Sequence, residues 1–287
     1  MVLLRFNKTT KKWGTIQREN KIEGDLYLDG QLLERLKFAK KQQKNDNDVV
    51  GLVCGDEGSG KTASAGNIMR FMTDDKFNPA TDMIGAESDE QVMDKIEKIK
   101  KGGALMFDEG NSYFLSTETM KTSQRELHKL FSIFRQKNLF VLIIAPGFFR
   151  LNSYFAVDRS RFLIRTYLVN GVRGYFKYFG DKRKNKLYRM GKKYHEYSIV
   201  PHTLQGRFTK CYSLETPEYL DFKTRTLKNT FDSFRKAKEK KPTEFQIKQK
   251  LINNLIITNP DISTKELASI LNLTERRVNQ LKKSNNE

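Results

Sequence analysis

Short apolar runs alternate with longer segments of helical periodicity through the first 170 residues. Three runs are apolar or glycine at every position, which is typical of strands buried on both faces of a sheet; these are Val49–Cys54, Ala104–Phe107 and Leu139–Ala145. Phe162–Val169 is a further expected strand. Apolar residues three or four apart predict helices over Gln31–Gln43, Lys61–Met72, Ser88–Lys101 and Gln124–Gln136. This alternation predicts an α/β fold with a parallel sheet.

The pattern changes at both ends of this core. Residues 1–30 predict a short hairpin, and Asn170-Gly171 predicts a second one. The tract that follows is rich in Tyr, Phe, Lys and Arg and β-like to about Leu214, after which Leu227–Lys241 is a charged helix or linker. We therefore expect an N-terminal hairpin and helix (1–48), an α/β core (49–170), a basic β-rich region with a linker helix (171–241) and a helical domain (242–287).

The segment Gly55–Thr62 (GDEGSGKT) matches the pattern GxxxxGK[ST] in full, between an expected strand and an expected helix. Glycines let successive backbone N–H groups point at phosphate oxygens, and the helix N-terminus adds partial positive charge. Lys61 would bind the β- and γ-phosphates, and the Thr62 hydroxyl would ligate Mg²⁺. The sequence therefore predicts a P-loop (Walker A) that takes ATP and Mg²⁺, with nucleotide-binding residues Gly55, Gly58, Ser59, Gly60, Lys61, Thr62 and Ala63.

An acidic pair, Asp108-Glu109, follows the apolar run Ala104–Phe107. In open α/β sheets ligands bind at the carboxyl ends of strands, so these side chains are expected near the P-loop. Asp108 would hold Mg²⁺ opposite Thr62, and Glu109 would orient or deprotonate the attacking water. With Lys61, this Walker B pair predicts an ATPase.

A glutamate beside the Walker B aspartate is the mark of the additional-strand (ASCE) ATPases, in which one strand lies between the P-loop and Walker B strands. Leu139–Ala145 would be that strand, although its tip, Ala145-Pro146, lacks the polar sensor often found there; Asn111 or Ser112 could substitute. In ring-forming enzymes of this class a neighbour's arginine completes the site. Arg159 and Arg161 are the expected fingers, and Arg135 and Arg150 are the alternatives.

The segment from Gly103 to Arg161 resembles the FtsK/HerA superfamily, especially its Zot-like branch of viruses and mobile elements. The likeness lies in GGALMFDEG, a helix ending in FRQKNL, and VLIIAPGFFRLNSYF with arginines beyond. It implies a RecA/FtsK-like core and a homo-oligomeric ring that translocates or packages DNA, with capsid, nuclease or replication proteins as further partners. The polar sensor expected in FtsK and HerA and the membrane span of true Zot proteins are not found in this sequence.

Two other functions stay open on these residues. One is an AAA+ switch that loads proteins onto DNA in replication or transposition, an arrangement that Arg159 and Arg161 also suit. The other is a DNA adaptor that binds nucleotide without hydrolysing it. A requirement for Glu109 would distinguish the motor and the AAA+ switch from the adaptor, because only hydrolysis needs this residue.

Charge favours a polyanionic partner, and DNA before a membrane surface. The chain has 53 Lys and Arg against 34 Asp and Glu, a net charge of +19. The segment 150–241 holds 23 basic and 8 acidic residues, which is most of that excess. We expect Lys182, Arg183 and Lys184 to contact DNA on strands; the alternative is a solvated Lys-rich surface.

The last 45 residues predict three helices that resemble a helix-turn-helix. Ser263 and Thr274 cap the second and third, Ala268 is small where two helices would cross, and the inward positions are Leu267, Ile270, Leu271, Val278 and Leu281. Outward residues of the third helix can contact bases or phosphates: Arg276, Arg277, Asn279, Gln280 and Lys282. The alternative is a trihelix for protein contacts.

Other classes find little support in the sequence. Cys54 and Cys211 make no disulfide framework, and the three histidines have no metal-ligand spacing with them. Basic residues interrupt any signal peptide near the N-terminus. The longest apolar stretch, Leu139–Phe149, is shorter than the ~20 residues of a membrane span. A cytoplasmic protein, in the host cytoplasm if viral, is expected.

Overall fold

The computed structural model describes residues 2–108, 114, 124–238, 244–260 and 262–283. The chain divides into two compact units, Met1–Asn229 and Thr230–Glu287. Within the described ranges, no helix combines the length and the apolar character needed to cross a bilayer.

A three-stranded antiparallel sheet opens the first unit. It contains β1 (Val2–Asn7), β2 (Lys12–Ile16) and β3 (Leu26–Leu28) in the order β2-β1-β3, so the predicted hairpin gains a third strand. Leu4, Leu26 and Leu28 pack into the same core as helix α1 (Gly30–Lys44). This small sheet therefore belongs to the first unit's hydrophobic core.

The main sheet has seven strands in the order β10-β9-β8-β4-β7-β6-β5. Their bounds are β4 (Val49–Gly55), β5 (Met83–Ile84), β6 (Ala104–Phe107), β7 (Phe140–Ala145), β8 (Ser160–Val169), β9 (Val172–Gly180) and β10 (Leu204–Arg207). Neighbours from β5 to β8 are parallel, and β9 is antiparallel to both β8 and β10. Strand β7 lies between β4 and β6, which confirms the predicted additional strand.

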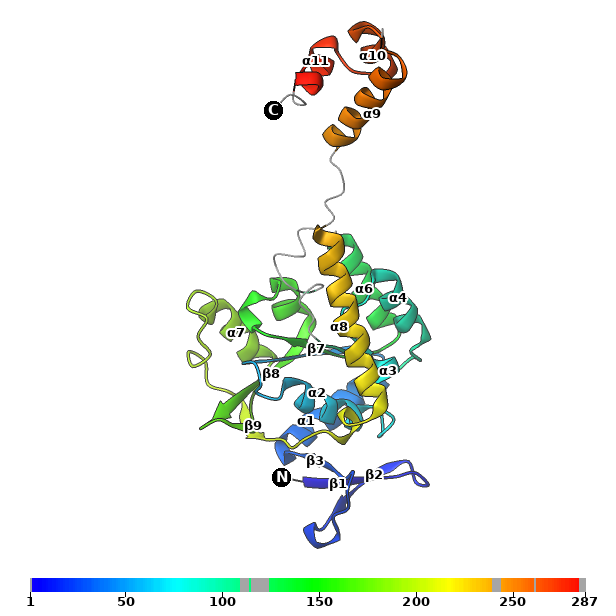
Figure 1. Ribbon diagram of the computed structural model, residues 1–287. Helices are drawn as coiled ribbons and strands as arrows, with labels where there is room; N and C mark the ends of the chain where they lie inside the picture. The colour runs from blue at the N-terminus through cyan, green and yellow to red at the C-terminus, as the bar shows by residue number, and fades with distance from the viewer. Residues whose placement is uncertain (1, 109–113, 115–123, 239–243, 261, 284–287) are drawn as a thin grey trace. The chain divides into compact units, whose positions relative to one another are not determined.

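Helices cover both faces of this sheet (Figure 1). Val49 and Val53 of β4 pack in the cluster that contains α1 and α2 (Lys61–Met72). Val50 and Leu52 pack in the cluster that contains α4 (Asp89–Lys98), α6 (Gln124–Gln136) and α7 (Asp181–Gly191). The fold is thus mixed α/β with a largely parallel sheet, consistent with a P-loop NTPase-like core.

The basic region after Asn170 differs from the expectation. Strands β9 and β10 extend the main sheet, and Asp181–Gly191 is the helix α7 where strands were predicted. The buried residues of α7 have helical spacing: Lys184, Leu187, Tyr188 and Gly191. This spacing was missed in the sequence because it comes directly after the alternating aromatic residues of β9. Helix α8 (Pro217–Lys238) begins ten residues before the predicted helix.

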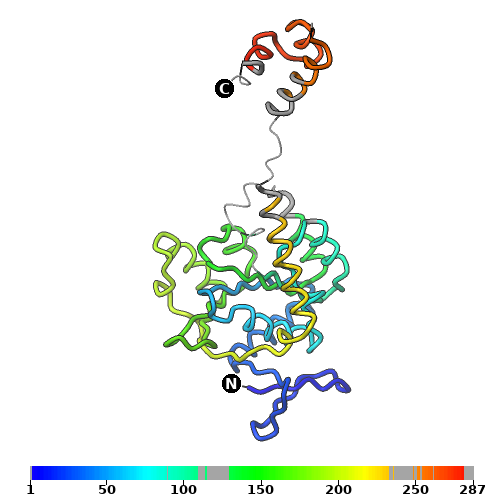
Figure 2. Tube along the Cα trace, viewed as in Figure 1, coloured from blue at the N-terminus to red at the C-terminus, as the bar shows by residue number. Residues whose placement is uncertain are grey.

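Short elements bring distant parts of the chain to helix α2. A single turn at Tyr212–Leu214 packs against α2, and the Cys211 sulfur lies 2.9 Å from the position that a Cβ on Gly66 would take. Figure 2 traces the path of the chain by residue number. Further single turns are Arg18–Asn20, Pro79–Asp82 (α3), Phe148–Arg150 and Tyr154–Arg159, the last a π-helical turn. The residues after β10 therefore return to the helix that follows the glycine-rich loop.

The second unit contains α9 (Glu244–Thr258), α10 (Thr264–Ile270) and α11 (Glu275–Lys283). Its small core consists of Ile252, Leu267, Ala268 and Val278. Ser263 caps α10 through a reciprocal capping box with Glu266. Ile270, the last residue of α10, was expected inside but is 59% exposed, so α10 contributes Leu267 and Ala268 to the small core and not Ile270.

Candidate nucleotide-binding site

The glycine-rich loop connects the carboxyl end of β4 to the first turn of α2. Gly55 has a φ of +152°, and a Cβ there would lie 2.2 Å from the Thr166 carbonyl oxygen of the neighbouring strand β8. Gly60 has a φ of +91° and precedes the helix directly. Both positions need glycine, and the bend they allow places the loop across the N-terminus of α2.

Two side chains of the loop bond within it. Ser59 is fully buried; its Oγ donates to the Asp56 carbonyl at 2.6 Å and lies 2.7 Å from Thr166 Oγ1. The Lys61 ammonium donates to the carbonyls of Gly55 (2.9 Å) and Asp56 (3.0 Å). The Lys61 ammonium therefore lies against the concave side of the loop, and Ser59 fixes the loop to strand β8.

The Thr62 hydroxyl and the Asp108 carboxylate meet across this loop. Thr62 Oγ1 lies 3.3 Å from Asp108 Oδ1, although the two residues are 46 positions apart. Thr62 stands in the first turn of α2, and Asp108 follows β6, held by a bond from its N–H to the Ile84 carbonyl at 2.8 Å. A hydroxyl and a carboxylate oxygen at this separation fit the ligand set of Mg²⁺ beside phosphate oxygens.

A cavity of about 550 Å³ opens over these residues. Lys61, Thr62, Ala63 and Asp108 line it together with the tip of β7 at Ile144–Pro146. The described part of the chain offers no group of three His, Cys, Asp or Glu side chains that could hold a metal by protein ligands alone. Because the Lys61 ammonium and the N-terminus of α2 carry positive charge, the cavity suits an anionic ligand such as a triphosphate.

Three predicted residues of the hydrolytic site lie outside the described residues. These are Glu109, Asn111 and Ser112. Their roles stay predictions from the sequence.

The predicted arginine fingers lie at the other edge of the sheet. Arg159 and Arg161 flank the amino end of β8, whereas the P-loop follows the carboxyl end of the parallel strand β4. Arg159 is paired with Asp48 at 2.5 Å and stacks on Phe131, with 18% of its side chain exposed. Arg159 is thus paired within its own chain, whereas Arg161 is exposed; that either acts as a finger for a neighbour remains a prediction.

The predicted DNA contacts divide into exposed and buried residues. Lys182 and Arg183 are exposed on α7, whereas Lys184 is fully buried and its ammonium donates to the carbonyls of Ala156 (2.6 Å) and Val157 (3.1 Å). Lys184 therefore cannot contact DNA in this conformation, which corrects that assignment. On α11 the exposed predicted residues are Arg276, Arg277, Asn279 and Gln280; nothing is described of the Lys282 side chain.

The cavity has two basic residues that were not among the predicted site residues. Arg173 of β9 and Lys223 of α8 both line it. The Asn170-Gly171 turn was a usable signal for Arg173, because a hairpin that reverses there returns the chain at the carboxyl edge of the sheet. Lys223 had no comparable signal, since its place depends on the packing of α8.

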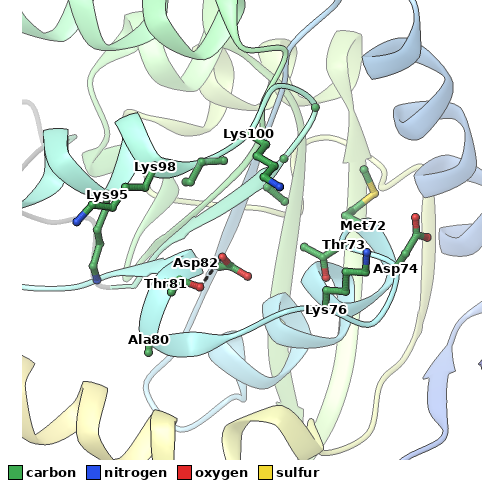
Figure 3. Close-up of a pocket in the computed structure, with 14 residues that line it drawn as sticks. Met72, Thr73, Asp74, Lys76, Ala80, Thr81, Asp82, Lys95, Lys98 and Lys100 are labelled. Carbon is green, nitrogen blue, oxygen red and sulfur yellow. Dashed lines mark hydrogen bonds between the residues drawn. The ribbon is translucent and has the colours of Figure 1, made fainter. Parts of the chain in front are cut away.

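A second cavity, of about 590 Å³, lies where α2 and α4 end and β6 begins. Figure 3 shows Lys76, Lys95, Lys98 and Lys100 around it, with Thr81 bonded to Asp82. Burial raises the pKa of Asp82, and its carboxylate accepts from Asn78 N–H and the Thr81 hydroxyl. Lysines here complement the negative ends of two helices, so a structural role explains them.

Comparison with known proteins finds similarity to solved structures but not to sequences. No protein-family model and no curated protein sequence matches this chain. The crystal structure of the N-terminal domain of zonular occludens toxin from Neisseria meningitidis superimposes with a TM-score of 0.40 at 13% identity, over 59% of this chain and 98% of that domain. The interpretation of the site therefore rests on its own geometry.

Proposed function

We propose that the chain binds Mg-ATP at Gly55–Thr62 and hydrolyses it. The observation that carries this proposal is the approach of Thr62 Oγ1 to Asp108 Oδ1 at 3.3 Å, directly beside the N-terminus of α2 and the Lys61 ammonium. A chance glycine-rich turn would not require a carboxylate from another strand at the same place.

Each residue has a definite part in this proposal. Thr62 and Asp108 would hold Mg²⁺, and Lys61 would bind the β- and γ-phosphates. When bound, Mg²⁺ neutralises phosphate charge. Backbone N–H groups from Gly58 to Ala63 supply the remaining anion contacts at the helix N-terminus. Glu109 keeps its predicted role of orienting or deprotonating water.

Titration of the full chain with a fluorescent ATP analogue and Mg²⁺, followed by phosphate-release assays, tests the proposal. Lys61→Ala should abolish binding or turnover, and Glu109→Gln should retain ATP but stop turnover. Lys98→Ala, at the second cavity, is the matched control and should behave as the wild type. Turnover that is at background in the wild type and unchanged by Glu109→Gln would favour the non-hydrolysing adaptor.

DNA association is a second proposed property, supported by the exposed polar face of α11. Arg276, Arg277, Asn279 and Gln280 are exposed while Val278 is buried in the small core. Arg276→Ala or Arg277→Ala should weaken duplex binding. If the lost arginine contacts one phosphate, the slope of log K against log salt concentration should become less steep by about 1 in each variant. Lys265→Ala on α10 is the control, and a flat salt response would contradict an electrostatic contact.

Ring assembly, translocation and packaging are proposed from the sequence resemblance alone. A motor should displace a protein roadblock on DNA in an ATP-dependent way, whereas a loader should show DNA-stimulated hydrolysis without displacement. Mass measurement with and without ATP tests assembly directly.

A further inference from the structure

Strand β8 and the segment just after β10 close around the glycine-rich loop. Because the Ser59 hydroxyl already donates within the loop, Thr166 Oγ1 of β8 donates to Ser59 Oγ at 2.7 Å; it also lies 3.4 Å from the Cys54 carbonyl oxygen. The Phe208 ring, just after β10, lies 3.0 Å from the position that a Cβ on Gly60 would take. Strands β8 to β10 and Phe208 therefore form one wall of the nucleotide site, which a separate DNA-binding appendage would not do.

Arg173 is the cation that this wall presents to the loop. Its Nη2 lies 3.9 Å from the position that a Cβ on Gly58 would take, and the residue lines the same cavity as Lys61 and Thr62. Its side chain is exposed, and it has no hydrogen bond or ion pair with any described residue. A guanidinium without a carboxylate partner beside an anion-binding loop is available to a phosphate.

The backbone fixes this position. The turn at Asn170 (φ +49°) and Gly171 (φ +75°) reverses the chain within two residues, so Arg173 is the second residue after the turn. Gly174 has a φ of +103°, and its carbonyl accepts the Phe208 N–H at 2.8 Å. The hairpin and the contact of its strand with Phe208 hold Arg173 beside the loop.

The tip of β7 is the place where additional-strand ATPases often carry a polar sensor side chain, and here it is apolar. The tip of β7 contributes Ile144, Ala145 and Pro146, which carry no polar side chain. Arg159, the expected finger, is bound to Asp48 at the other edge. Among the described residues, Arg173 is therefore the arginine that lines the cavity.

We propose that Arg173 is a catalytic residue that acts within its own subunit, binding the terminal phosphates of ATP and stabilising the charge that develops during hydrolysis. This inference rests on the proposed ATPase function. In that reaction a water oxygen bonds to the γ-phosphorus, the bond to the bridging oxygen breaks with its electron pair going to ADP, and the water proton is released. Arg173 donates N–H bonds to phosphate oxygens throughout and exchanges no proton.

The experiment compares Arg173→Ala, Arg173→Lys and Arg207→Ala in phosphate release and in Mg-ATP binding by the full chain. Arg207 is the matched control, because it stacks on Tyr175 on the adjacent strand and does not line the cavity. Arg173→Ala should lower kcat about 100-fold or more while ATP affinity changes far less. Arg173→Lys should recover part of kcat, since it keeps the charge without the fork, and Arg207→Ala should match the wild type.

Mixing two inactive variants tests whether the arginine acts in the same subunit. Arg173→Ala combined with Lys61→Ala should stay inactive, since neither protein then has a complete site; restored turnover would place Arg173 in a neighbour's site and overturn the inference. Equal kcat in Arg173→Ala and wild type would also overturn it while leaving the ATPase intact. Failure of the wild type to bind Mg-ATP would remove both proposals.

Discussion

The two edges of the seven-stranded sheet both carry cations, but in different states. At the carboxyl edge, Arg173 and Lys223 line the cavity beside the N-terminus of α2 and have no ion pair with any described residue. At the amino edge, Arg159 pairs with Asp48 and Lys101 with Asp46 at 3.0 Å. Helix dipoles also distinguish the two edges. The positive N-terminus of α2 lies at the carboxyl edge, whereas the negative C-termini of α2 and α4 lie at the amino edge.

This difference teaches that pairing, and not the number of basic residues, distinguishes the candidate site. Sequence composition counts Arg159 and Arg173 alike, and spacing favoured Arg159 as the functional one. The structure gives Arg159 a carboxylate and an aromatic partner, whereas Arg173 lies beside the glycine-rich loop. A cation already neutralised within its own subunit has little electrostatic free energy left for a phosphate.

The largest effect should come from removing the carboxylate at the carboxyl edge. Asp108→Asn should reduce Mg²⁺-dependent turnover more than about 100-fold, since even outer partners of metal ligands are worth 10–100-fold. Phosphate release as a function of Mg²⁺ concentration measures it. Asp82→Asn is the matched change at the second cavity and should leave turnover unchanged; equal losses in both would remove the distinction between the edges.

Arg159→Ala should act on stability and leave the chemistry alone. It leaves the Asp48 carboxylate, only 10% exposed, without its partner, so we expect a loss of about 2 kcal/mol in the free energy of unfolding. Urea denaturation measures this loss, and Asp48→Asn in the same chain should recover part of it. Turnover per folded molecule should stay at the wild-type level; a loss confined to assembled protein would instead restore Arg159 as a finger for a neighbour.

Most of the core elements were predictable because local signals defined them. Helix α2 begins after Gly60 and α4 begins at a Ser88–Gln91 capping box, so neighbouring residues determine where both helices start. The Thr62–Asp108 approach also followed from strand order. The Asn170-Gly171 turn indicates which end of the sheet Arg173 lies at, but its approach to the loop was not predictable, because it depends on pairing between β8 and β9 and on Phe208 packing far along the chain.

The brace between the loop and β8 should have a smaller effect. Thr166→Val removes the hydroxyl that bonds Ser59, and both side chains are fully buried, so about 1–2 kcal/mol of unfolding free energy should be lost. A double-mutant cycle with Ser59→Ala isolates the bond, and a coupling near zero would contradict it. Weaker ATP binding in Thr166→Val would further show that strand β8 supports the nucleotide site.

The smallest effect concerns Lys184, a cation at the amino edge that is satisfied by carbonyls. Burial lowers its pKa to about 8, although Asp181 opposes the shift. The unfolded chain keeps a lysine pKa near ~10.4, so between these values it binds more protons than the folded chain, and raising the pH favours folding. The unfolding free energy of the wild type relative to Lys184→Met should therefore rise from pH 8 to pH 10, as measured by denaturation at each pH. If this difference in unfolding free energy instead fell between pH 8 and pH 10, the folded protein would stabilise the charged form of Lys184. The contrast between the two edges would then be weaker.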